Sequence, residues 1–233
     1  FEGLTRARTH IETNLQNARE LFDERSRELL SQGGDRWINR KLSEVCEKIT
    51  DGTHQTPKYF AEGYIFLSSK NVTSRKIDWD NVKYIDEEQH QAMHKRIAPR
   101  RGDVLLAKNG TTGVAAMVDR DVVFDIYVSL AHLRPLDFLT SEYLLYFVNS
   151  SMAKAQFNSR LKGQGVPNLH LKEIREVTIT FPEDKAEQIR TVGAIRNLEQ
   201  ETDSLEAHYT AKLQDLDDLR QSLLQKAFAG ELT

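Results

Sequence analysis

Apolar residues recur every three or four positions through the first part of the chain, a spacing typical of one face of an α-helix. The stripe contains Leu4, Ala7, Ile11, Leu15, Ala18, Phe22 and Leu29, with Arg25 in the remaining step. Gly33 and Gly34 follow it directly, and glycine readily adopts the positive φ that ends a helix. The pattern therefore predicts a long helix with one apolar face in the segment 1–36.

A longer helical pattern fills the segment 183–233. Pro182 ends a strand-like run, and Asp184 with Glu187 three residues later resembles a capping box. The stripe that follows contains Ile195, Leu198, Thr202, Leu205, Tyr209, Leu213, Leu216, Leu219 and Leu223. Its spacing alternates mostly between three and four, as in a coiled coil. A helix of this length cannot bury its stripe alone, so we expect an antiparallel pair with the first helix. The side chains expected in helix pairing or partner contacts are Leu15, Phe22, Leu205, Leu216, Leu223 and Phe228.

The middle of the chain has a different pattern. Short apolar runs at 64–67, 104–107, 114–118 and 122–133, separated by Gly, Asn and Asp, predict strands, and 141–161 predicts a helix. We therefore expect an α/β (α+β) globular domain over residues 37–182, flanked by the two long helices of 1–36 and 183–233.

The net charge of −3 conceals an uneven distribution. Residues 1–36 carry 6 Lys and Arg against 7 Asp and Glu, residues 37–182 carry 20 against 17, and residues 183–233 carry 6 against 11. The three segments therefore have net charges of −1, +3 and −5. A weakly basic globule is compatible with binding DNA phosphates, although +3 is also ordinary for a domain without a nucleic-acid partner.

Composition favours a cytoplasmic protein that has no membrane partner. The only cysteine, Cys46, cannot form an internal disulfide, and no apolar run approaches the roughly 20 residues that span a bilayer.

Motifs for catalysis or cofactor binding are weak. Asp103 and Lys108 have the wrong spacing for a metal-dependent nuclease, and the turn 110–113 is not followed by the Gly-Lys-Ser/Thr of a phosphate loop. The seven histidines show no metal-ligand spacing, and His90 and His94 lie in a polar stretch where exposed side chains are expected. We therefore expect no catalytic residue, no metal site and no cofactor bound by this chain.

Polar loops that contain amide, hydroxyl and basic side chains are the remaining candidates for function. Arg and Lys suit guanine edges, Asn and Gln suit adenine edges, and Ser and Thr contact bases or phosphates. The candidate DNA-binding residues are Thr53, His54, Gln55, Lys70, Asn71, Lys108, Asn109, Thr111, Thr112, Arg160, Lys162, Gln164 and Asn168. Each of them taken singly is also typical of a solvated surface loop.

Several of these segments resemble a known family. The closing run LQDLDDLRQSLLQKAFAGEL at 213–232 is similar to the helical region that ends specificity subunits of type I restriction-modification systems. The segment 18–37, which begins with AREL and ends with GGDRW, resembles the central helical region of those subunits. The runs DGTHQTP at 51–57, GDVLL at 102–106, GTTG at 110–113 and QGVPNL at 164–169 resemble their recognition-domain pattern.

The resemblance implies a non-enzymatic subunit that reads one half of a split DNA site and docks modification subunits. Those subunits would bind S-adenosylmethionine, and restriction subunits would join the complex indirectly. A complete family member has two recognition domains and this chain has one. It is therefore expected to be the second half of such a subunit, whose first half is missing, or a half-length form that pairs with a copy of itself.

Two other classes stay open on the residues alone. A coiled-coil assembly scaffold needs only the helices and would not read DNA. A stand-alone nuclease or methyltransferase would need clustered acids or a cofactor loop, which the sequence lacks. DNA affinity distinguishes the scaffold from the recognition subunit.

Overall fold

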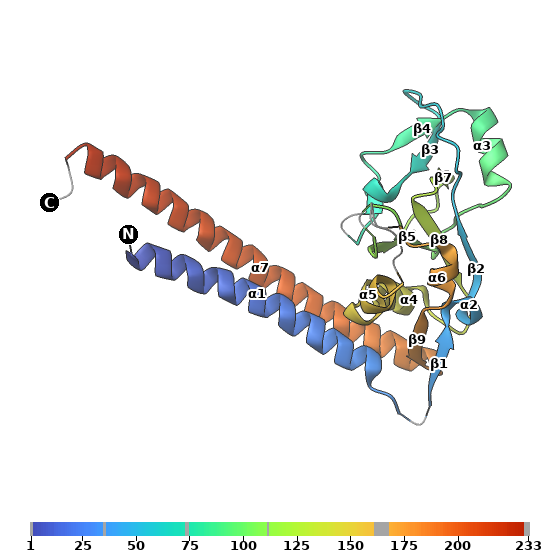
Figure 1. The fold of residues 1–233 in the computed structure, drawn as a ribbon, viewed down its shortest axis with the longest axis horizontal. Coiled ribbons are helices and arrows are strands. Elements are labelled where there is room, and N and C mark those ends of the chain that lie inside the picture. Colours follow the sequence, from blue (N-terminus) through green and yellow to red (C-terminus); the bar gives the residue numbers. More distant parts are fainter. Residues whose placement is uncertain (1, 35, 73–74, 111, 161–167, 231–233) are drawn as a thin grey trace. The chain divides into compact units, whose positions relative to one another are not determined.

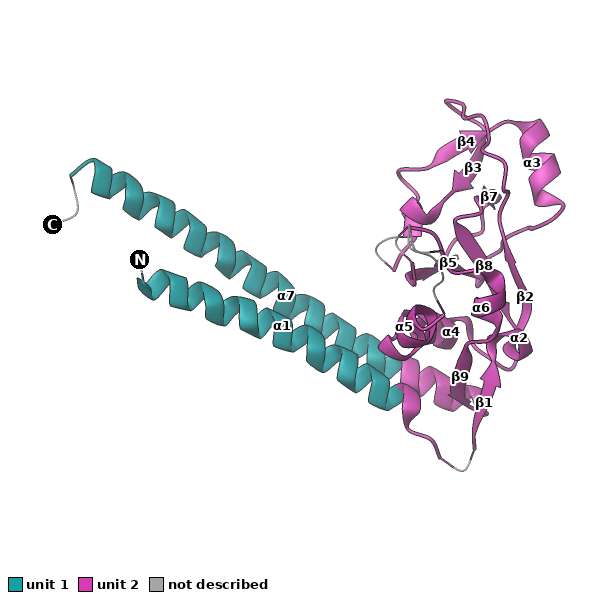
Figure 2. Cartoon of the chain, in the orientation of Figure 1, with its two compact units in different colours: residues 1–29, 193–233 teal, residues 30–192 magenta. Residues whose placement is uncertain are grey.

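The computed structural model describes residues 2–34, 36–72, 75–110, 112–160 and 168–230. The chain forms two compact units, one of residues 1–29 and 193–233 and the other of residues 30–192 (Figure 2). We call them the helical unit and the globular unit. Within the described ranges, no helix is both long enough and apolar enough to cross a membrane.

The helical unit is an antiparallel pair formed by α1 (Glu2–Ser31) and α7 (Lys185–Phe228), as Figure 1 shows. Arg8 forms an ion pair with Asp217 at 2.5 Å, and Arg19 forms one with Glu206 at 2.8 Å. From the first pair to the second, α1 advances eleven residues and α7 runs back eleven. Eleven residues make about three turns, so both pairs lie along the same side of the two helices.

The buried stripe differs in detail from the sequence pattern. Ser26, which is 7% exposed, occupies the buried position that the pattern gave to Arg25. The side chain of Arg25 is exposed and pairs with Glu28. On α7, Leu205 is 44% exposed and Leu219 is 48% exposed. Spacings of three and of four residues both keep side chains on one helix face. The sequence pattern therefore could not decide which of two adjacent residues is buried.

The helix-pairing residues thus divide into two groups. Leu15, Phe22, Leu216 and Leu223 are partly buried, as an apolar seam requires. Leu205 lies mostly outside the seam, and Phe228, at the end of α7, is 89% exposed. The expectation that Phe228 packs in the helix pair is therefore wrong for this chain.

Two sheets share the main core of the globular unit. The first is antiparallel, with the order β2 (Cys46–Asp51), β8 (Leu130–Pro135), β5 (Val104–Ala107) and β6 (Ala115–Met117). The second has the order β4 (Lys83–Ile85), β3 (Tyr64–Leu67) and β7 (Phe124–Ile126), with β3 and β7 parallel. Leu67, Leu105 and Phe124, one from each of three strands, belong to a single buried cluster.

Short helices cover these sheets, and the longest of them differs from the prediction. The helices are α2 (Leu42–Val45), η1 (Ser69–Val72), α3 (Glu87–His94), α4 (Ser141–Asn149), α5 (Ser151–Asn158) and α6 (Leu171–Arg175). The single helix expected over 141–161 is two, because Ser150 is extended and its hydroxyl accepts from the Ala153 amide to cap α5. Ser at an N-cap position commonly starts a new helix in this way.

The ends of the globular unit lie together. β1 (Trp37–Lys41) pairs antiparallel with β9 (Thr178–Pro182), with Trp37 opposite Pro182. Asp184 caps the start of α7 by accepting from the Ala186 amide at 3.0 Å. Glu187, expected to complete a capping box, accepts instead from the indole nitrogen of Trp37 at 3.0 Å.

Candidate nucleic-acid interface

The segment 127–129 connects several loops of the globular unit. It was expected to lie inside one strand over 122–133, but it separates β7 from β8, which belong to different sheets. The Tyr127 amide donates to the Leu67 carbonyl at 2.8 Å, and the Val128 amide donates to the Thr53 carbonyl at 2.9 Å. The apolar run alone gave no reason to expect this break, although the polar Ser129 inside it was an available signal.

Ser129 joins two further loops to the segment 127–129. Its hydroxyl accepts from the Ser69 amide at 3.0 Å, and its carbonyl accepts from the Lys108 amide at 2.9 Å. The Lys108 carbonyl in turn accepts from the Leu169 amide at 2.9 Å. Parts of all four candidate loops, around 53, 69, 108 and 168, are therefore joined through 127–129. We call this arrangement the loop junction.

The candidate residues fall into three groups by exposure. His54, Gln55 and Lys70 are exposed, and Thr53, Asn109, Thr112, Arg160 and Asn168 are partly exposed. Asn71 and Lys108 are buried. Thr111, Lys162 and Gln164 lie outside the described residues.

Lys108 is not the free loop cation that its neighbours suggested. Its side chain is only 5% exposed, and its Nζ lies 3.2 Å from Oδ2 of Asp51, which is 6% exposed. The other Asp51 oxygen lies 3.1 Å from Nη2 of Arg96 and 3.4 Å from Nε2 of His54. Lys108 therefore holds the base of its loop by neutralising a buried carboxylate.

Asn71 and Arg160 also make contacts within the fold. The Asn71 amide donates to the Asp78 and Asn81 carbonyls at 3.3 and 3.1 Å, and its oxygen accepts from the Ser68 amide at 2.9 Å. Arg160 donates to the Gln156 carbonyl at 2.9 Å. Among the charged and amide candidates that the structure describes, Gln55 and Lys70 are those most accessible to a ligand.

Asn109 and Asn168 face each other across an isolated antiparallel bridge. The Oδ1 atom of each is buried and has no hydrogen-bond partner among the described residues. An unsatisfied buried amide oxygen is costly, so each needs a donor such as a water or a bound ligand.

Gly52 holds the first loop against β7. A Cβ atom at this position would lie 1.9 Å from the Ile126 carbonyl oxygen, so only glycine permits the approach. A pocket of about 520 Å³ lies beside this loop and is lined by Thr53, Gln55, Met93, Arg96 and Asp125, among others.

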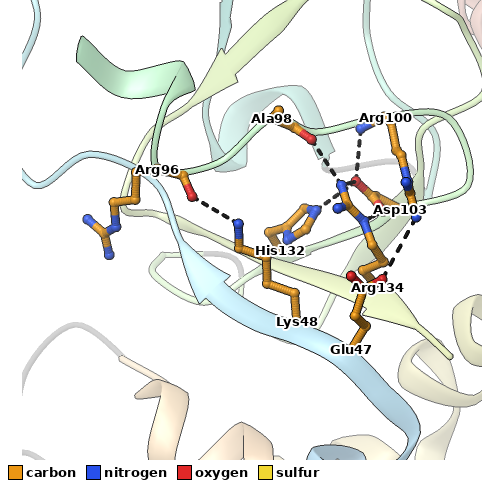
Figure 3. Close-up of polar contacts among 8 residues, drawn as sticks. All are labelled: Glu47, Lys48, Arg96, Ala98, Arg100, Asp103, His132 and Arg134. Atoms are coloured by element: carbon orange, nitrogen blue, oxygen red, sulfur yellow. Dashed lines mark hydrogen bonds and ion pairs between the residues drawn. The ribbon is translucent and has the colours of Figure 1, made fainter.

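A buried ionic cluster supports the sheet below the loops (Figure 3). Asp103, which immediately precedes β5, accepts from Nε and Nη2 of Arg134 at 2.8 Å each and lies 2.7 Å from Nε2 of His132. Burial opposes ionisation of Asp103, but the hydrogen bonds from Arg134 and His132 outweigh it and hold its pKa well below the ordinary value. Asp103 therefore links the start of β5 to β8.

The expectation of exposed histidines on 90–94 is wrong for His90. Its side chain is 11% exposed, and its Nδ1 lies 2.6 Å from Oδ2 of Asp125, which is 2% exposed. His94 Nδ1 lies 3.2 Å from the other Asp125 oxygen. Asp125 is distant in sequence, so the histidine spacing alone could not show the cluster.

Comparison with known proteins agrees with this architecture. A family model described as type I restriction modification DNA specificity domain matches residues 34–215. The specificity subunit of the type I restriction enzyme EcoBI from Escherichia coli is 25% identical over 173 residues, which are 74% of this chain and 36% of that protein.

Solved structures show the same fold. A chain from a study of complex assembly and conformational transition of the type I R-M system has a TM-score of 0.80 and 22% identity, over 99% of this chain and 56% of that one. The HsdS subunit from Thermoanaerobacter tengcongensis has a TM-score of 0.64 and 21% identity, over 99% and 55%. This chain thus spans about half the length of those solved chains and less of the EcoBI subunit. Because the family model covers most of its residues, the chain belongs to the family of type I restriction modification DNA specificity domains.

Proposed function

We propose that this chain is a non-catalytic recognition module that reads one half of a bipartite DNA site. The proposal combines the family membership with the chain's share of its relatives, which corresponds to one recognition domain with its helices. The activity of the whole complex would reside in modification subunits that bind S-adenosylmethionine, with restriction subunits joining indirectly.

The observation that carries the proposal is the loop junction. Segments of four loops rich in amide, hydroxyl and basic side chains are joined directly or through Lys108 to 127–129, mostly by main-chain hydrogen bonds and in one case by the Ser129 hydroxyl. The main chain at the bonded residues Thr53, Ser69, Lys108 and Leu169 is therefore held in place. The exposed side chains of Gln55 and Lys70 stay available. A rigid main chain with free polar side chains suits base and phosphate contacts.

Different residues have different roles in this proposal. Lys70 contacts phosphate as a point charge, and Gln55 reads a base edge with its amide, for which adenine is the best match. Asn109 and Asn168 carry the unsatisfied amide oxygens and would gain a donor when DNA or its ordered water is bound. Lys108 supports its loop from inside the fold.

The helical unit has the length expected of a spacer. α7 has 44 residues, which correspond to about 66 Å of straight helix, or roughly two turns of DNA. α1 has 30 residues, or about 45 Å, so the paired part is shorter than α7. Such a pair would fix the separation between two recognition domains and offer a surface to modification subunits. The second recognition domain would come from the missing first half or from a second copy of the chain.

The test uses the chain assembled with its modification subunits. Fragments selected from a random DNA pool are labelled, and binding is followed by fluorescence anisotropy over a range of salt concentrations. Lys70→Ala should weaken binding to all fragments and reduce the salt slope by about 1. Gln55→Ala should cost about 1–3 kcal/mol on the selected site and relax specificity at one base pair.

Lys172→Ala is the matched control, because Lys172 is exposed on α6 of the same globular unit. It should leave affinity and specificity unchanged. If Lys70→Ala and Gln55→Ala both bind like the parent while assembly is intact, these residues do not form the interface. Absence of any DNA selectivity in the parent complex would favour the coiled-coil scaffold.

A further inference from the structure

Two histidines and an aspartate meet where α3 packs against β7. The Nδ1 atoms of His90 and His94 lie 2.6 and 3.2 Å from the two carboxylate oxygens of Asp125. The side chains are 11%, 29% and 2% exposed, respectively. One potential ligand atom from each residue lies within 4.8 Å of the other two.

Local structure holds these side chains in place. His90 and His94 are four residues apart on α3, so they project from the same face of the helix. The ring of His90 stacks on Tyr64 of β3 with centroids 3.8 Å apart and planes inclined by 8°. Asp125 is the central residue of β7, which pairs with β3 in parallel register. The cluster is therefore fixed by three elements of the fold.

We propose that His90, His94 and Asp125 bind a divalent first-row transition metal ion, for which Zn²⁺ is the best match. Two imidazoles and one carboxylate are typical zinc donors, whereas Mg²⁺ and Ca²⁺ prefer oxygen ligands only. Tetrahedral bonds of about 2.0–2.2 Å place neighbouring donor atoms about 3.4 Å apart. The potential ligand atoms lie within 4.8 Å of one another, so the side chains would draw closer together around the ion. The partly exposed side of His94 leaves room for water as the fourth ligand.

Charge favours an ion at this position. Among the described residues, the ion-pair partners of the nearly fully buried Asp125 carboxylate are the two imidazoles. A buried carboxylate needs a compensating positive charge, and a dipositive ion held by these three side chains would supply it.

The ion would clamp α3 to β7. Met93 of α3 and Asp125 of β7 both line the pocket beside the loop that begins at Gly52. Metal binding would therefore fix one wall of that pocket and stabilise the globular unit, because the unfolded chain does not hold these three ligands together.

The experiment uses the full chain without a histidine tag, after treatment with EDTA. Co²⁺ is added as a spectroscopic probe, and Zn²⁺ affinity is measured by calorimetry. The parent should bind one ion per chain, develop visible Co²⁺ absorption and unfold at a higher temperature with Zn²⁺. His94→Gln, at a partly exposed position, should weaken Zn²⁺ binding by about tenfold or more.

His170→Gln is the control, because His170 is exposed at the start of α6 and distant in sequence from the cluster. It should bind Zn²⁺ like the parent. Saturable binding that His94→Gln does not weaken, or no saturable binding by the parent, would overturn the proposal and leave a hydrogen-bonded packing cluster. The measurement involves no DNA, so its result is independent of the proposed recognition function.

Discussion

Asp51, Asp103 and Asp125 are almost fully buried in the globular unit. Asp51 is neutralised by Lys108 and Arg96. Asp103 is neutralised by Arg134 and lies within hydrogen-bond distance of His132. Each buried carboxylate joins segments that are separate in sequence. The removal of one charge from such a pair leaves the other without compensation, and this loss is strongly destabilising.

Asp103→Asn tests the cluster in Figure 3. The substitution keeps the size of the side chain but leaves the Arg134 guanidinium, which is 14% exposed, without its counter-charge. We expect a loss of about 3 kcal/mol in the free energy of unfolding, measured with urea. Asp121→Asn is the control, because Asp121 is 78% exposed and pairs with Arg101 at 3.4 Å. The control should cost less than about 1 kcal/mol, and equal losses in both variants would contradict the prediction.

The free energy of unfolding of the parent and that of Asp103→Asn should depend differently on pH. The pKa of Asp103 in the folded state lies well below its ordinary value of about 3.9. Its contribution is therefore complete above about pH 4 and is lost as the pH falls towards the folded-state pKa. We expect the stability gap between the parent and Asp103→Asn to narrow below about pH 4. A gap that stays constant down to acid unfolding would show that ionisation of Asp103 is not its source.

Lys108→Ala should destabilise the globular unit. Asp51 would lose its buried cation and keep two exposed neighbours, Arg96 and His54, whose side chains are 52% and 66% exposed. We therefore expect a loss of about 3 kcal/mol and a lower midpoint in thermal unfolding. Lys70→Ala, at an exposed position, should unfold like the parent. A Lys108→Ala variant with unchanged stability would instead support the direct DNA contact expected from the sequence.

For single residues, the sequence predicted the exposure of side chains in polar loops better than it predicted long-range partners. Gln55 and Lys70 are exposed in polar loops, as the composition of those loops suggested. The buried state of Lys108 depends on Asp51, which is 57 positions earlier and has no local pattern that marks it as a partner. Long-range ion pairs of this kind leave no periodic signal in one sequence.

Long elements with a regular apolar spacing could be predicted from the sequence, whereas short interruptions within an apolar run could not. The spacing of apolar residues predicted both long helices and their antiparallel arrangement, which the pairs Arg8–Asp217 and Arg19–Glu206 confirm. The breaks at Ser150 and at 127–129 were missed, because each is an interruption of one to three residues in an otherwise regular run. The second break matters more, since it forms the loop junction.

The two faces of α7 give a prediction for the helix pair. Leu216 is partly buried in the seam, whereas Leu219 on the same helix is 48% exposed. Leu216→Asp should cost up to about 2 kcal/mol and lower the temperature at which helical circular dichroism at 222 nm is lost. Leu219→Asp should have little effect in the isolated chain. Equal losses of stability in the two variants would contradict the placement of Leu216, but not Leu219, between the paired helices.

At the scale of the whole molecule, a single continuous segment forms the globular unit, and the helical unit takes residues from both ends of the chain. Pairing of β1 with β9 brings the two ends of the globular segment together, and the Trp37–Glu187 hydrogen bond reinforces this closure. Changes in period and composition led to the expectation of three segments, 1–36, 37–182 and 183–233, and these bounds stay a prediction. The sequence could not predict that strands at positions 37–41 and 178–182 are neighbours, because strand pairing across such a distance has no local signature.

Main-chain atoms make most of the contacts of the loop junction, and this has an evolutionary consequence. The hydrogen bonds from Tyr127, Val128, Lys108 and Leu169 depend on backbone amides and carbonyls, whatever side chains the exposed positions carry. Substitutions at positions such as 55 and 70 can therefore accumulate with little loss of stability. Under the proposed recognition function, such a protein can acquire a new target sequence through few mutations, and each intermediate variant stays folded.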